Sequence, residues 1–70
     1  MALSARNQLA GTVKSVVTDQ IMTEVVVTLG DGQELVSVIT ASSARRLGLK
    51  AGQPITVVIK STEVMLATEE

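Results

Sequence analysis

The chain has 70 residues, of which 46% are hydrophobic, and a formal net charge of −1 at pH 7. It contains neither His nor Cys, which excludes Ser-His triads, disulfides and thiolate metal sites, and we therefore do not expect an enzyme. It also lacks aromatic residues, and its six Lys and Arg residues do not cluster, so we expect no nucleic-acid partner.

No segment stays apolar for the roughly 18 residues that suggest a membrane helix. The N-terminal residues also lack the basic and then apolar pattern of a signal peptide. We therefore expect a cytoplasmic protein with no membrane partner. A chain of this size makes a single domain, residues 1–70, and buries only about 60% of its unfolded surface. With no disulfide available, subunit association is the remaining way to stabilise so small a core.

Five segments have the β-branched residues and turn boundaries of strands: residues 9–17, 23–29, 34–40, 54–60 and 64–67. Between the third and fourth, residues 41–47 favour one or two helical turns, started by Thr40 or Ser42 and ended by Gly48. This order predicts an all-β fold, a five-stranded OB-like barrel with one short helix between strands 3 and 4.

Several of these strands carry apolar side chains on both faces. Val26 lies opposite the face that Val25 and Val27 share, and Val58 lies opposite Val57. Scattered exposed valines are one explanation. Since the chain has no aromatic side chain to fill a core, we favour packing between subunits and expect a homo-oligomer.

Two short runs, residues 4–9 and 60–62, each pair a cation with hydroxyl or amide donors. Arg6 offers a planar fork of N–H groups and Lys60 a compact charge, while Ser4 and Ser61 can each donate a hydroxyl hydrogen. Two cations would balance one dianion, so the runs predict the two halves of an oxyanion site. An isolated pair of such cations would more often be solvated or form surface salt bridges. The two halves could meet within one barrel or across subunits.

The opening run Ser4-Ala5-Arg6-Asn7-Gln8-Leu9, taken with Gly11, resembles the molbindins, the small Mop-domain proteins that bind molybdate. The likeness covers essentially the full length, because the family's middle and closing motifs are similar to residues 38–43, 47–52 and 58–65. The resemblance implies an OB-like fold of the Mop/TOBE type and a homohexamer built as a trimer of dimers. It also implies molybdate, with tungstate as a surrogate, held at subunit interfaces for intracellular storage and homeostasis.

Molybdate has four oxygens that accept on the order of eight hydrogen bonds and donate none, so its site must consist of donors. No metal ion would be coordinated directly. A second group, Thr40 and Ser43, stands at the expected helix start, where backbone N–H groups attract anions, although a helix cap explains these residues equally well. The resemblance places both in contact with the anion, together with Ser4, Arg6, Lys60 and Ser61. Ala5, Asn7 and Ser42 are weaker candidates.

Three functions other than molybdate storage fit a small domain of this kind to different degrees. An OB module for nucleic acid would need aromatic platforms and a basic groove, which this chain lacks. An enzyme of cofactor assembly would need a nucleotide-binding loop or an acid-base pair, and neither is present. A protein-interaction or anion-sensing module without a storage role is the main alternative, because Mop-like domains also occur fused to other domains.

Overall fold

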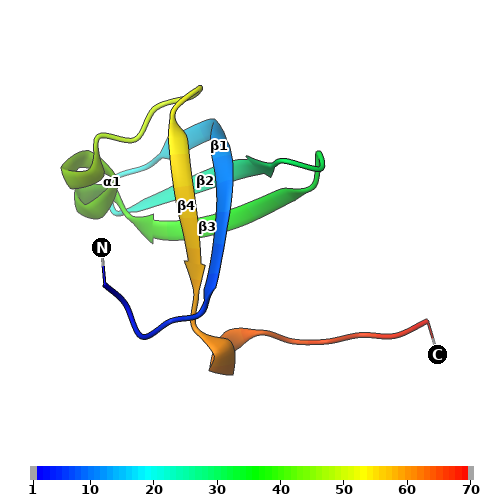
Figure 1. Cartoon of the computed structure of the whole chain (residues 1–70). Coiled ribbons are helices and arrows are strands. Elements are labelled where there is room, and N and C mark those ends of the chain that lie inside the picture. The colour runs from blue at the N-terminus through cyan, green and yellow to red at the C-terminus, as the bar shows by residue number, and fades with distance from the viewer. Residues whose placement is uncertain (1, 70) are drawn as a thin grey trace.

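The structure, a computed structural model, describes residues 2–69 and shows a curled sheet with one helix (Figure 1). The elements in chain order are β1 (Asn7–Thr18), β2 (Met22–Leu29), β3 (Glu34–Thr40), α1 (Ala41–Leu47), β4 (Pro54–Ile59) and a 3-10 turn, η1 (Ser61–Glu63). No helix within residues 2–69 is long and apolar enough to cross a membrane.

The strands form one antiparallel sheet in the order β3-β2-β1-β4. The long strand β1 pairs with β2 on one side and with β4 on the other. Gly11, for example, is paired with both Leu29 of β2 and Ile55 of β4. A Cβ added to Gly11 would lie only 2.6 Å from Val27 Cγ1 and 2.8 Å from the carbonyl oxygen of Thr28. Glycine therefore permits the close approach of β1 and β2 at this point.

The core is aliphatic and lies inside the curl of the sheet. Val13, Val25 and Val27 are buried, and partly buried side chains from β1, β2, β3, β4 and the segment after α1 pack against them: Val16, Leu29, Ile39, Leu49, Ile55 and Val57. Thr23 is fully buried, and its hydroxyl lies 2.9 Å from that of Thr18. This pairing lets a polar side chain sit in an apolar interior.

Local signals at the connections are confirmed. Thr40 caps α1, because its Oγ1 accepts a hydrogen bond of 3.1 Å from the backbone N–H of Ser43. Gly48 ends the helix in the left-handed conformation with φ of 63°, which favours glycine. Residues 30–33 connect β2 and β3, as the hairpin signal at residues 30–32 predicts.

The predicted fifth strand at residues 64–67 is wrong: within the described residues the sheet has four strands, and residues 64–69 belong to no helix or strand. The turn η1, closed by a hydrogen bond of 2.9 Å from the Glu63 N–H to the Lys60 carbonyl, follows β4 directly. After this turn the chain runs outward from the body of the fold (Figure 1). The mostly β class and the position of the helix between β3 and β4 are confirmed.

Candidate anion-binding site

The two donor runs of the sequence meet in one hollow. Pairing of Asn7 with Ile59 joins the start of β1 to the end of β4. The residues just outside this pair, Arg6 and Lys60, are thereby brought side by side. The hollow has a volume of about 520 Å³ and is lined by residues from both runs: Ser4, Ala5, Arg6, Asn7, Lys60 and Ser61.

Among residues 2–69, the lining of this hollow is rich in donors and contains no carboxylate. In the part of the chain that the structure describes, the side chains of Arg6 and Lys60 form no hydrogen bond or ion pair, and both residues are exposed. Gln8 fixes the approach to β1, because its Nε2 donates a hydrogen bond of 2.8 Å to the carbonyl of Ala5. The hollow thus carries two unneutralised positive charges on a chain whose formal net charge is −1, which suits a dianion.

The hollow is large for such a ligand. Its volume of about 520 Å³ falls in the range of roughly 300–1,000 Å³ that is typical for drug-sized ligands. A tetrahedral oxyanion has only five atoms and cannot contact all of the lining at once. Further donors, from water or from another chain, must approach to surround the anion completely.

The second predicted group lies elsewhere. Thr40, Ser42 and Ser43 do not line the hollow. Strand β1 begins at Asn7, beside the hollow, and at its other end Thr18 is paired with Thr23, next to the Met22–Thr40 pair. The structure therefore places the two donor groups at opposite ends of β1 and does not bring them together within one chain.

The hydroxyls of this second group are already engaged with one another. Thr40 donates a hydrogen bond of 2.8 Å to Ser43 Oγ, and the Ser42 and Thr40 hydroxyls lie 3.3 Å apart. Arg46 Nη2 also donates to Ser43 Oγ, at 3.0 Å. Sequence reasoning overlooked Arg46 here, although its i, i+3 spacing from Ser43 on a helix was a usable signal. This cluster caps α1, and Arg46 places a positive charge beside the cap.

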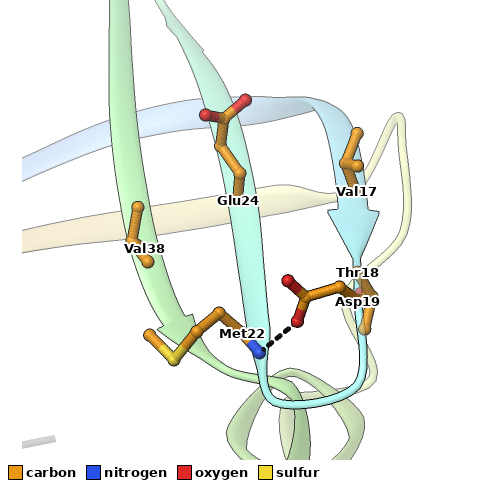
Figure 2. Close-up of a pocket in the computed structure, with 6 residues that line it drawn as sticks. All are labelled: Val17, Thr18, Asp19, Met22, Glu24 and Val38. Atoms are coloured by element: carbon orange, nitrogen blue, oxygen red, sulfur yellow. Dashed lines mark hydrogen bonds between the residues drawn. The ribbon is translucent and has the colours of Figure 1, made fainter.

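A different hollow, at the end of β1 and the start of β2, carries negative instead of positive charge (Figure 2). Its lining combines apolar side chains with two carboxylates, Asp19 and Glu24. Hydrogen bonds to the Asp19 carboxylate from the backbone N–H groups of Met22, at 2.8 Å, and Ile21, at 2.9 Å, lower the pKa of Asp19. Asp19 therefore stays ionised at neutral pH, and this hollow would repel an oxyanion.

Comparison with known proteins identifies the family of this chain and relatives whose names refer to molybdenum. The sequence model of the TOBE domain matches residues 3–66. The chain belongs to the TOBE domain family. Within it, the chain is 44% identical over 66 residues to molybdenum-pterin-binding protein 1 of Clostridium pasteurianum, an alignment that covers 94% of this chain and 97% of that protein. The resemblance to the Mop proteins is thus confirmed.

One relative of the chain is much longer. The chain is 41% identical over 69 residues to the molybdenum transport protein ModE of Herbaspirillum seropedicae, an alignment that covers 99% of this chain. It spans only 26% of the length of that relative. The same domain therefore occurs both as a protein of about this length and as part of a longer chain.

Solved structures of TOBE-family relatives share the fold. A molybdate-binding protein from Sporomusa ovata superimposes with a TM-score of 0.91 at 37% identity, covering 97% of this chain and 100% of that one. The cytoplasmic molybdate-binding protein ModG, with molybdate bound, gives a TM-score of 0.83 at 43% identity and covers 87% of this chain and 43% of its own.

Proposed function

We propose that this protein binds molybdate, with tungstate as a surrogate, for intracellular molybdenum storage and homeostasis. The observation that carries the proposal is the meeting of Arg6 and Lys60 in a hollow to which the described residues contribute no carboxylate. Ser4 and Ser61 add hydroxyl donors, and the main chain around Ala5 and Asn7 can add N–H groups. Two relatives named as molybdate-binding proteins share the fold over 97% and 87% of this chain, which supports the choice of anion.

We further propose that the anion is held at a subunit interface of a homohexamer, a trimer of dimers, in the cytoplasm. The hollow is open and larger than the anion, so a neighbouring chain has room to supply further donors. Thr40, Ser42 and Ser43 lie at the opposite end of β1, so only a second copy could add them to the hollow of the first. The relative ModG, described as cytoplasmic, supports the location.

The proposed role is binding without catalysis. The described lining of the hollow offers cations, hydroxyls and amides but no carboxylate, imidazole or thiol. Such a site can hold an anion through hydrogen bonds and charge but has no general acid or base to transfer a proton. Selectivity over sulfate, which shares the shape and charge of molybdate, would come from the size and rigidity of the donor cage.

The test is a calorimetric titration of the purified protein with molybdate, repeated with tungstate and with sulfate at the same concentrations. We expect saturable heat from molybdate and tungstate and little from sulfate. The number of anions bound per chain then shows whether each hollow holds its own anion or whether several chains share one. Absence of saturable heat from molybdate, at protein concentrations well above the expected Kd, would refute the proposed function.

An anion-sensing or protein-interaction role is the second candidate, favoured by the occurrence of this domain as about a quarter of the ModE relative. The two roles differ in their effect on cells. Storage predicts that cellular molybdenum rises in proportion to the amount of this protein, whereas sensing predicts no such rise. Metal analysis of cells with and without the expressed protein distinguishes them.

A further inference from the structure

The connection between β2 and β3 contains a pair of residues that reacts spontaneously in unfolded chains. The pair is Asp31-Gly32, and no other Asp-Gly or Asn-Gly step occurs in the sequence. The backbone nitrogen of a glycine is unhindered, so it can attack the side-chain carbonyl carbon of a preceding Asp. Both residues are exposed to water, and they lie at the end of the hairpin that is farther from α1 (Figure 1).

The hairpin itself requires this glycine. Gly32 has a φ of 89°, a left-handed conformation that glycine adopts without strain. Its N–H donates a hydrogen bond of 3.0 Å to the carbonyl of Leu29, and the Leu29 N–H donates one of 2.7 Å to the carbonyl of Gln33. A tight loop that ends in such a glycine is a common hairpin connection. A bulkier residue at position 32 would slow the reaction but would strain the turn.

The reaction at this pair has a defined chemical course. The Gly32 nitrogen forms a bond to Cγ of Asp31, and the hydroxyl of the neutral carboxylic acid leaves with the amide proton as water. A second water molecule then opens the five-membered imide. Opening at the main-chain carbonyl leaves the chain linked through Cγ, as isoaspartate, with no change in mass. Only the neutral acid has a hydroxyl that can leave, so ionised Asp31 is unreactive.

Gln33 holds the Asp31 carboxylate in this unreactive form. Its Nε2 donates a hydrogen bond of 2.5 Å to Oδ2, and its backbone N–H donates one of 3.1 Å to Oδ1. The side-chain amide of Gln33, and after it the backbone N–H, lower the pKa of Asp31, because these donors stabilise the ionised carboxylate. The Gly32 N–H is engaged with Leu29 at the same time, so both reacting groups are held by hydrogen bonds.

We infer that Asp31 is the modification site at which this chain isomerises to isoaspartate, and that the hydrogen bonds from Gln33 restrain this reaction in the folded protein. The reactive pair and the residue that protects it are three consecutive residues of one connection. None of them lines the anion-binding hollow. The inference therefore stands apart from the proposed function.

Isomerisation here would disturb the sheet. Isoaspartate adds one carbon atom to the main chain between Leu29 and Gln33, whose hydrogen bond closes the hairpin. The pairing of Leu35 with Val27, which is a core residue, follows soon after this closure. Within the described residues β3 pairs only with β2, so its register depends on this hairpin. Modified chains should therefore unfold at a lower urea concentration than unmodified chains.

The test measures isoaspartate in the full chain during several weeks at neutral pH and physiological temperature. Cleavage after Glu24 and Glu34 releases residues 25–34, in which Asp31 is the only Asp. The isoaspartyl form of this peptide has the same mass, so it is separated by chromatography and identified by fragmentation. The full chain unfolded in guanidinium chloride gives the rate without protection. We expect isoaspartate to accumulate many times faster in the unfolded chain than in the folded one.

Three variants distinguish the hydrogen bonds of Gln33 from the general rigidity of the hairpin. Gln33→Ala removes the side-chain donor, so we expect isoaspartate to form several times faster than in the folded wild type. Gln33→Lys keeps a donor on a long side chain and should stay close to the wild-type rate. Lys14→Ala breaks the ion pair between Lys14 and Glu34 beside the same hairpin but leaves Gln33 in place, so it should also stay close to the wild-type rate.

Equal rates in the wild type and Gln33→Ala would overturn the inference, as would equal rates in the folded and unfolded chains. A rate in Gln33→Lys or Lys14→Ala as fast as in Gln33→Ala would show that hairpin flexibility, and not the donor at position 33, controls the reaction. These measurements contain no molybdate. Their outcome therefore leaves the titration that tests the proposed function unaffected.

Discussion

Removal of the Lys60 ammonium group is the sharpest test of the anion-binding hollow. The side chains of Lys60 and Arg6 form no hydrogen bond or ion pair within residues 2–69, so their substitution by Ala breaks none. We expect Lys60→Ala and Arg6→Ala to change the free energy of unfolding of the ligand-free protein by less than about 0.5 kcal/mol. Any loss of anion affinity can then be assigned to the site itself.

The size of that loss follows from the exposure of the site. A hydrogen bond to a charged group contributes about 1.5–3 kcal/mol, and the lower end applies because both cations are exposed. A loss of about 1.5 kcal/mol raises the Kd for molybdate roughly tenfold. Lys60→Arg keeps the positive charge, so it should weaken molybdate binding less than Lys60→Ala does.

Lys50→Ala is the matched control in calorimetric titrations at constant ionic strength. Lys50 lies before β4, whereas Lys60 follows its other end, and Lys50 does not line the hollow. At physiological salt the Debye length is about 8 Å, so the distant charge contributes little. We expect a change in Kd of less than about twofold for Lys50→Ala. Equal effects of Lys50→Ala and Lys60→Ala, or no effect of Lys60→Ala and Arg6→Ala, would refute the site.

Three further predictions concern the scaffold, and each is measured by urea unfolding. Gly11→Ala forces a Cβ against a backbone oxygen and should destabilise the fold by about 1–3 kcal/mol; Gly30→Ala, with open space around it, should cost clearly less. Thr40→Ala removes the side-chain cap of α1 and should cost about 1 kcal/mol, so an unchanged midpoint would contradict the capping role. The pKa of Asp19 is lowered in the folded chain, so its contribution to stability is present above its unfolded pKa and disappears as pH falls through the folded value. The stability difference between wild type and Asp19→Ala should therefore shrink in acid, and a constant difference would count against this linkage.

Local structure was predictable wherever a few neighbouring residues determine it. Gly30-Asp31-Gly32 between two Val-rich runs indicated the β2–β3 hairpin, and Thr40 and Gly48 marked both ends of α1. These signals depend on backbone conformation and on hydrogen bonds between residues close in the sequence.

Features that depend on contacts distant in sequence were less accessible. The two donor runs were identifiable by their chemistry, but their meeting depends on the pairing of Asn7 with Ile59, which composition does not reveal. The strand prediction at residues 64–67 failed because propensity describes a segment, whereas a strand also needs a neighbour. Propensity also gave no sign that the turn at Ser61–Glu63 leads this segment away from its own sheet.

The proposed anion site and the proposed subunit association reinforce each other, because the site is proposed to lie at an interface. Lys60 follows β4, and Ser61 begins η1, so both residues lie where the chain leaves the sheet. An anion that binds both residues restricts the chain at this point, and a chain already held by a neighbouring subunit loses less conformational entropy when the anion binds. Any ligand that binds only the assembled state stabilises it by RT ln(1 + [L]/Kd), or about 2.7 kcal/mol at a concentration of 100 Kd. The small core of this chain would thus be stabilised both by a neighbouring chain and by the bound anion.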